Sequence, residues 1–186
     1  MEPDQIVSQT TAHMKKAVDH TLHEFGTIHT GKASPAMVET VQVDAYGSMM
    51  PLKEVAAITT PDSRTISIQP WDKTVLKGVE SALLKANLGF TPTIMGDKIF
   101  CPLPELSKER RKELVKMCHN LAEQGKVGVR AARRDGMDGI KQAEKDKAIS
   151  EDDRKLYEKE IQDHTDKSVK EIDQHLKHKE EELMKV

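Results

Sequence analysis

Small and apolar residues recur every three or four positions along residues 107–148, a stretch without proline. This spacing places them on one face of an α-helix, so the stretch predicts a single long helix. Four of these positions are glycines, each of which weakens a helix by on the order of 1 kcal/mol relative to alanine. Because the glycines lie on the packing face, they predict close approach of a neighbouring helix. The packing face comprises Leu114, Cys118, Leu121, Gly125, Gly128, Ala132, Gly136, Gly139 and Ala143.

Two more helices are predicted at the chain ends. Residues 4–28 carry inward positions at alternating gaps of four and three, which is a heptad pattern. A final helix is predicted after Ser150, which can form a reciprocal cap with Asp153. The inward positions are Val7, Thr11, Met14, Val18, Thr21, Phe25 and Ile28 in the first helix, and Ile161, Thr165, Val169, Ile172, Leu176 and Leu183 in the last. The outer face of the last helix offers three acid–lysine pairs at i,i+4 spacing, namely Glu151–Lys155, Asp163–Lys167 and Asp173–Lys177.

Between these helices the hydrophobic period changes from helical to alternating. The pattern predicts a strand at 41–45 that returns at 49–52, strands at 55–60 and 65–69 around a turn at 61–63, and a hairpin at 94–100. A helix is predicted from Asp72 or Thr74 to Asn87. Its inward positions are Val75, Val79, Ala82, Leu83 and Ala86. Trp71 is predicted to pack in the core or at an edge of this β-rich block, which is the commoner use of a lone tryptophan, although an exposed contact is the alternative.

The predicted fold class is therefore α+β. None of the three long helices can bury its apolar stripe alone, so together they predict an elongated antiparallel three-helix bundle from residues 1–30 and 105–186. Residues 31–104 form an inserted small α+β domain with a sandwich-like β/α/β arrangement. Because the insertion is joined by two linkers, we predict a hinge of restricted rotation. The predicted hinge residues are Thr30, Gly31, Lys32, Ala33, Cys101, Pro102, Leu103, Pro104 and Glu105.

Composition supports exposed helices over one compact globule. Hydrophobic residues make up 37% of the 186 positions and aromatic residues only 3%, against 32% charged residues. This thin core predicts an elongated monomer of two separately folding parts. The two cysteines do not make a disulfide framework, which favours reduced thiols in the cytosol. The acidic start argues against a signal peptide, and no run approaches the roughly 18 apolar residues of a membrane span.

A basic stripe is the strongest candidate for a binding surface. It lies on the long helix about 200° of rotation away from neighbouring packing-face positions, and so is predicted to face away from them. Its three arginines suit bidentate contacts with phosphates. With a net charge of −2, any affinity for nucleic acid must come from such a local patch. A solvated charged face is the alternative interpretation. The stripe consists of Lys126, Arg130, Arg133, Arg134, Met137 and Lys141.

No catalytic or metal-binding constellation is predicted. The sequence has no glycine-rich phosphate loop, no zinc-ligand spacing, and no nucleophile with an obvious base. Cys118 falls on a packing face and reads as a structural thiol. His20 and His23 are one helical turn apart but lack a third ligand. We therefore expect no catalytic residue, no cofactor and no metal.

The order of motifs resembles the bacterial ribosome recycling factor family over the whole chain. The motifs are TGKASP at 30–35, VDAYG at 43–47, DSRTISI at 62–68, LGFTP at 88–92, PLPELSKERRKEL at 102–114, VRAARRD at 129–135, ISEDD at 149–153 and KEEELM at 179–184. Several motifs in the right order are more specific than any one of them. The resemblance implies a bundle with an inserted domain, arranged as an L.

The resemblance also implies a non-enzymatic, cytoplasmic translation factor. Family members bind the ribosome after peptide release and split it into subunits with the GTPase elongation factor G. Their helical domain lies along large-subunit ribosomal RNA, which implies RNA contacts by Arg130, Arg133 and Arg134. Lys126, Lys141 and Lys32 complete the predicted RNA-binding set, although Lys32 and His29 stand where the family often has arginine.

Two other function classes remain as alternatives. The bundle could serve a coiled-coil adaptor or scaffold without RNA binding, whose contacts would depend on apolar area. RNA binding would instead weaken steeply with salt. A small hydrolase or transferase built on the inserted domain lacks candidate residues.

Overall fold

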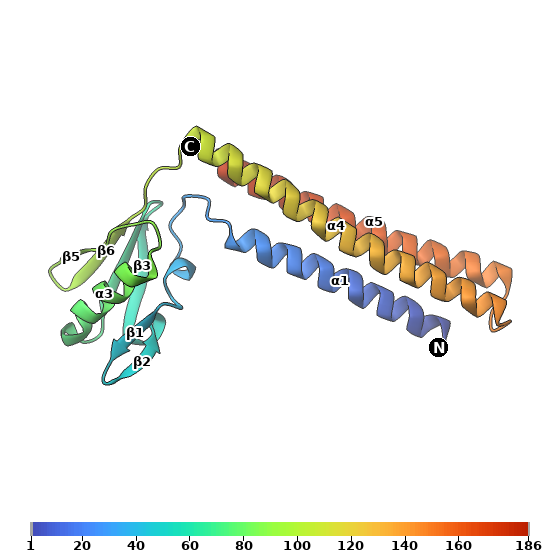
Figure 1. Cartoon of the computed structure of the whole chain (residues 1–186), viewed down its shortest axis with the longest axis horizontal. Coiled ribbons are helices and arrows are strands. Elements are labelled where there is room, and N and C mark those ends of the chain that lie inside the picture. The colour runs from blue at the N-terminus through green and yellow to red at the C-terminus, as the bar shows by residue number, and fades with distance from the viewer. Residues whose placement is uncertain (1, 186) are drawn as a thin grey trace. The chain divides into compact units, whose positions relative to one another are not determined.

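The computed structural model describes residues 2–185 and divides the chain into two compact units. Unit 1 contains the chain up to His29 and again from Lys108 onward, and unit 2 is Thr30–Ser107. The sequence predicted residues 31–104 for the inserted domain, so the observed unit 2 begins one residue earlier and ends three residues later. Unit 1 is helical, whereas unit 2 combines strands and short helices (Figure 1).

Three long helices form unit 1: α1 (Pro3–Thr27), α4 (Lys108–Lys145) and α5 (Glu151–Met184). They lie side by side, and each contacts the other two (Figure 1). Helix α4 runs antiparallel to α1, because Gly125 lies against Thr21 and Gly136 lies against Thr10. It also runs antiparallel to α5, to which it is joined by an ion pair between Lys126 and Asp173. The predicted antiparallel three-helix bundle is confirmed.

The glycines of α4 bring α1 close, as predicted. Ile6, Thr10, Ala17 and Thr21 of α1 lie against Gly139, Gly136, Gly128 and Gly125 in that order. The packing face of α4 is nevertheless broader than predicted. Ala122, Val129 and Ile140 are also buried, whereas Leu121, Gly128 and Gly139 are only partly buried. The physical reason is that α4 packs against two helices, so one stripe cannot cover its buried surface.

The outer helices match most of their predicted patterns. Of the inward positions predicted for α1, all but the half-buried Thr11 are buried. Ser150 and Asp153 form the predicted capping box at the start of α5. The predicted Glu151–Lys155 pair is present at 2.8 Å. The prediction for Asp173 was wrong, because its carboxylate binds Lys126 of α4 instead of Lys177.

Unit 2 contains two antiparallel sheets. Strands β1 (Gln42–Ala45) and β2 (Ser48–Pro51) form a hairpin. A four-stranded sheet has the order β3-β4-β6-β5, with antiparallel neighbours throughout. Its strands are β3 (Ala56–Asp62), β4 (Thr65–Pro70), β5 (Thr93–Met95) and β6 (Lys98–Pro102). The helices are α2 (Leu52–Val55) and α3 (Leu76–Ala86), with 3-10 turns at Pro35–Met37 and Lys73–Val75.

The core of unit 2 joins the hairpin, the sheet and α3. Buried side chains from each of them form one cluster, including Val43, Ile66, Ile68, Val79, Leu83, Ile99 and Cys101. Asp72 caps the segment that leads into α3 by accepting a hydrogen bond from the Thr74 N–H. Ala86, predicted to face inward, is exposed because α3 ends there.

Three local predictions in unit 2 were wrong. Residue Val55 ends the short helix α2 and does not begin a strand. Strand β6 continues through Cys101 and Pro102, which were predicted to lie in a linker. Proline is tolerated there because β5 pairs with β6 only as far as Phe100, so the end of β6 has a partner on one side only.

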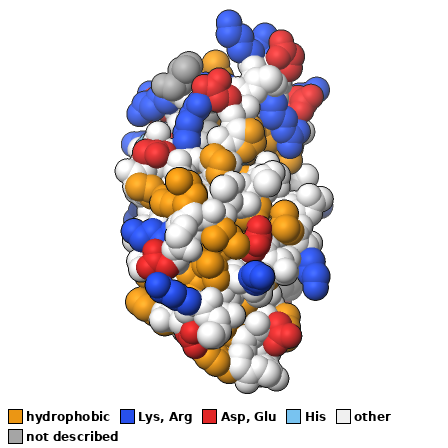
Figure 2. Space-filling model, turned by 90° about the vertical axis from the view of Figure 1, so that its left-hand side faces the viewer, with side chains coloured by type: hydrophobic (Ala, Val, Ile, Leu, Met, Phe, Trp, Pro, Cys, Tyr) orange, Lys and Arg blue, Asp and Glu red, His pale blue; other side chains and the backbone are white. Residues whose placement is uncertain are grey.

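Trp71 is the third correction, since 70% of its surface is exposed. It directly follows the last residue of β4, and its N–H still donates to the Val55 carbonyl at 3.0 Å, so its backbone is held at the end of the sheet while its side chain lies outside the core. Other large apolar side chains of unit 2 are exposed as well, namely Tyr46, Met49, Leu84 and Met95. Figure 2 shows a face of the molecule on which hydrophobic side chains gather between charged ones.

Candidate nucleic-acid interface

The basic stripe of α4 borders a surface hollow of about 500 Å³, here called the basic hollow. Six of its lining residues come from α4 and one comes from α5. Four of the side chains are cationic and two are carboxylates, so positive charge is in excess. The lining residues are Arg130, Arg133, Arg134, Met137, Asp138, Lys141 and Glu158. The structure thus brings together five of the six residues of the predicted stripe.

Arg133 is the best-positioned arginine of the basic hollow. It is half-buried, and its Nε donates a hydrogen bond of 2.8 Å to Gln162 Oε1 on α5. A guanidinium has five N–H donors, and this bond uses only one of them. The bond therefore fixes the direction of the side chain and leaves donors for an anionic ligand.

Arg130 and Arg134 are more exposed. The Arg130 guanidinium lies 3.6 Å from Glu123, and its side chain is 54% exposed. At such exposure an ion pair is weak and easily exchanged for another anion. Arg134 is exposed one position beyond Arg133 on the same helix. These two guanidinium groups are available to phosphates without breaking a buried interaction.

Lys126 lies outside the basic hollow, which corrects its predicted place on one continuous exposed stripe. Its side chain is only 16% exposed, and its Nζ lies 2.5 Å from Asp173 Oδ1 of α5 and 3.5 Å from Glu123. The hydrogen bond to Asp173 raises the pKa of this lysine. The stripe therefore runs beside α5, and at Lys126 it connects the two helices. Lys32, also predicted to bind RNA, is exposed and belongs to unit 2.

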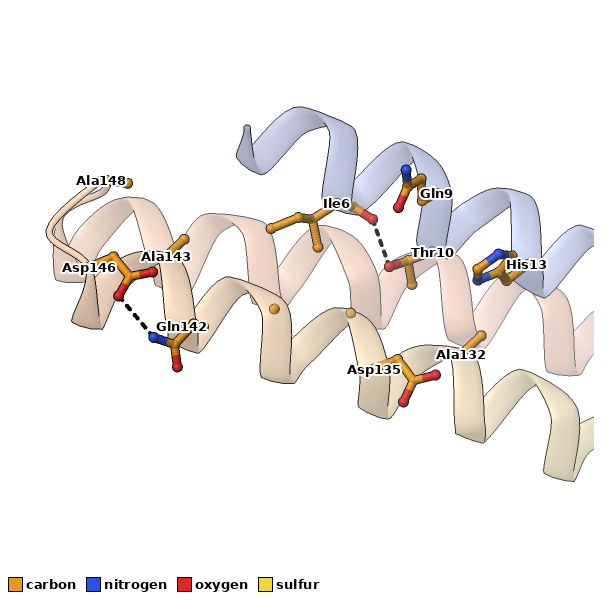
Figure 3. A pocket seen from close by; sticks show the side chains of 12 residues that line it. Ile6, Gln9, Thr10, His13, Ala132, Asp135, Gln142, Ala143, Asp146 and Ala148 are labelled. Atoms are coloured by element: carbon orange, nitrogen blue, oxygen red, sulfur yellow. Dashed lines mark hydrogen bonds between the residues drawn. The ribbon is translucent and has the colours of Figure 1, made fainter. Parts of the chain in front are cut away.

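A second hollow, of about 400 Å³, lies between α1 and α4 (Figure 3). It follows the glycine face, where Gly136 and Gly139 carry no side chains. Polar groups at its rim are already used in part, since Gln142 donates to Asp146 and the hydroxyl of Thr10 donates to the Ile6 carbonyl. Its lining combines acidic, amide and imidazole groups without an excess of positive charge. This hollow is therefore a poor site for a phosphate.

The described residues show no arrangement suited to nucleophilic or metal chemistry. Within residues 2–185 no group of three His, Cys, Asp or Glu side chains could hold a metal ion. Both cysteines are buried. Burial raises the pKa of the Cys101 thiol to about 11 and also raises that of Cys118. A thiol that stays protonated is a poor nucleophile.

The two connections between the units are attached to the same turn of unit 2. The Ala33 N–H donates to the Ser63 carbonyl at 2.8 Å, and the Leu103 N–H donates to the Arg64 carbonyl at 2.7 Å. Arg64 also lies 2.5 Å from Glu105. Gly31 adopts a φ of +79°, which favours glycine. Ala33, Cys101, Pro102 and Leu103, all predicted as hinge residues, are thus held by the β-rich unit. These long-range backbone bonds left no signal in the sequence.

Comparison with known proteins identifies the family. The model of the family described as ribosome recycling factor matches residues 21–184. A ribosome-recycling factor of Rhodopseudomonas palustris strain TIE-1 is 48% identical over 180 residues, with 97% of each chain covered. One from Nitrobacter winogradskyi is 49% identical over 173 residues, covering 93% of this chain and 92% of the relative.

Solved structures agree with this match. The solution structure of a ribosome recycling factor is 36% identical, with a TM-score of 0.80 over 100% of this chain and 99% of the other. A model of the Thermus thermophilus factor, with Escherichia coli elongation factor G on the E. coli post-termination complex, is also 36% identical, with a TM-score of 0.66 over 100% of both chains. Among the described residues, no helix combines the length and the apolar character that crossing a membrane requires. The chain belongs to the ribosome recycling factor family.

Proposed function

We propose that this chain binds the ribosome after peptide release and, together with the GTPase elongation factor G, separates it into subunits for reuse. Membership of the family supports this proposal. So does the similarity to the Thermus thermophilus factor, whose structure was described together with elongation factor G on a post-termination complex. The chain would act as a monomer in the cytoplasm, without a cofactor.

The observation that carries the proposal is the basic hollow of α4. Its three arginines lie within five residues of one another on one helix, with Lys141 two turns further along. Closely spaced guanidinium groups suit the repeating phosphates of an RNA backbone, since each can bind a phosphate through two N–H groups. We assign Arg130, Arg133, Arg134 and Lys141 to contacts with large-subunit ribosomal RNA. Lys126 supports them by joining α4 to α5, and Lys32 is a further contact from unit 2.

The energy for splitting would come from elongation factor G, since the described residues contain no site suited to nucleophilic or metal chemistry. Movement of unit 2 relative to an anchored unit 1 would transmit the push of the GTPase. The residues that permit this motion are Thr30, Gly31, Lys32, Pro104 and Glu105, which lie outside β6 and outside the two backbone hydrogen bonds to Ser63 and Arg64. The ion pair of Glu105 with Arg64 is exposed and therefore weak enough to break during such a motion.

Replacing Arg133 tests the RNA-binding assignment. We expect Arg133→Ala, and to a lesser extent Arg130→Ala, to weaken binding to purified ribosomes at moderate salt while the helical circular dichroism is unchanged. Asp135→Ala on the α1 side of α4 is the charge control and should bind normally. Gln162→Ala removes the hydrogen bond of Arg133 but keeps its charge, and should have the smaller effect. Normal binding by Arg133→Ala would mean that the basic hollow is merely a solvated surface.

A further inference from the structure

Glu158 is an unfavourable group in the basic hollow. It is the one lining residue contributed by α5, and it lines the same hollow as the three arginines of α4. A carboxylate there competes with phosphate, because it offers the arginines the same bidentate partner. Whether Glu158 competes with phosphate depends on which other groups bind its carboxylate oxygens.

Arg154 binds the carboxylate of Glu158. Its Nη1 donates a hydrogen bond of 2.9 Å to Glu158 Oε2, one helical turn further along α5. Its Nε lies 3.0 Å from Glu144 Oε2 near the end of α4, an ion pair without hydrogen-bond geometry. The three side chains are between 21% and 34% exposed, so they are better shielded from solvent than ordinary surface pairs. Arg154 itself is not one of the residues that line the hollow.

The position of Arg154 is well fixed. Its backbone N–H bonds to the Ser150 carbonyl directly after the capping box, in the first turns of α5. The hydrogen bond to Glu158 is the main cause of the raised pKa of Arg154, and the charge of Glu144 adds to it. Arg154 therefore stays charged throughout the physiological pH range.

We propose that Arg154 is a positioning residue of the RNA-binding surface: by binding Glu158, it prevents that carboxylate from pairing with the arginines of α4. This inference rests on the proposed function, because it assumes that the basic hollow binds phosphates. Loss of Arg154 would release Glu158 toward the nearest guanidinium and remove about one cation from the set that meets RNA. If Arg154 only joined α4 to α5, its loss would instead act by lowering the stability of the bundle.

The test compares three variants for binding to purified large ribosomal subunits over a series of salt concentrations. Arg154→Gln should weaken binding about threefold to tenfold and lower the salt slope by about one, as for one lost phosphate contact. Glu158→Gln should bind as well as the original protein or more tightly. The double variant Arg154→Gln/Glu158→Gln should recover binding, although its lost contact with Glu144 keeps its melting temperature low.

Lys155→Gln is the matched control, since it removes one positive charge at the adjacent position. Lys155 pairs with Glu151, and neither residue lines the hollow. The control should bind normally, and Arg154→Lys, which keeps the charge, should retain most binding. Unchanged binding by Arg154→Gln, or a double variant as weak as Arg154→Gln, would overturn the inference. Arg133→Ala is measured alongside: if it also binds normally, the proposed function fails, and if it alone is weak, only the role of Arg154 fails.

Discussion

At the scale of single residues, the close contact between α1 and α4 depends on glycines of α4, which have no Cβ at the contact. Thr10 and Thr21 are buried, but their hydroxyls are satisfied, because each donates to the carbonyl four residues earlier in α1. A Cβ on Gly136 would lie 2.7 Å from Thr10 Cγ2 and closer still to Oγ1. The glycines that weaken α4 as an isolated helix are therefore what lets the bundle close.

Gly136→Ala should destabilise unit 1 although alanine is the better helix former. The gain in helix propensity is about 1 kcal/mol, whereas forcing apart a close helix contact costs roughly 1 to 3 kcal/mol, so a net loss is expected. Denaturant unfolding of the variants measures this. In a Thr10→Ala background, Gly136→Ala should instead raise the free energy of unfolding, because the clashing Oγ1 and Cγ2 atoms of Thr10 are gone.

Gly26→Ala is the control for the preceding prediction, since nothing lies within 4 Å of the added Cβ. It should raise the free energy of unfolding by up to about 1 kcal/mol, as expected from propensity alone. Equal effects of the two glycine replacements would show that packing at Gly136 does not matter.

At the scale of secondary-structure elements, the start of α5 connects folding with the candidate site. The capping box fixes where α5 begins, and so fixes Arg154 in its first turns. The Ser150 side chain accepts from the Asp153 N–H at 3.1 Å, while Asp153 accepts from the Ser150 N–H at 3.2 Å. Hydrogen bonds from Ser150 lower the pKa of the Asp153 carboxyl.

Ser150→Ala should lower the melting temperature by a few degrees at neutral pH, as expected for the loss of one helix cap in a chain of this size. The pKa of Asp153 is lower in the folded chain than in the unfolded chain. Its contribution is therefore present above the unfolded value of about 3.9 and is lost as the pH falls through the folded value. The difference in melting temperature between the original protein and Ser150→Ala should shrink below pH 4. A difference that stays constant down to pH 2 would contradict the role of the carboxylate.

The elements that could be predicted from the sequence are those whose signal is local. Periodicity gave the three long helices, the close glycine face and the capping box, since each depends on residues a few positions apart. Two errors, at Val55 and Ala86, lie where short helices end, and the others depend on distant partners. The length of β6 depends on where β5 stops, the exposure of Trp71 on the end of the sheet, and the pairing of Lys126 on Asp173 of another helix. The basic stripe was predicted, but the carboxylate of Glu158 beside it was not.

At the scale of the whole molecule, the proposed hinge predicts that binding and splitting can be separated. A disulfide between one engineered cysteine in each unit, selected by screening exposed positions, should leave ribosome binding intact but abolish splitting by elongation factor G. Cys101 and Cys118 can stay in place, because both are buried and their raised pKa values make them slow to react. Reduction of the same sample should restore splitting and serves as its control. Full splitting activity in the oxidised form would leave the linkers without a mechanical role.

The central claim is that the arginines of the basic hollow bind the phosphates of ribosomal RNA. The most direct measurement is the slope of log affinity against log salt concentration for purified large subunits, comparing the original protein with Arg130→Gln/Arg133→Gln/Arg134→Gln. Counterion release predicts a steep negative slope for the original protein and a slope shallower by roughly three for the variant. Equal slopes would contradict the claim, because they would show that these three arginines displace no counterions from the ribosome.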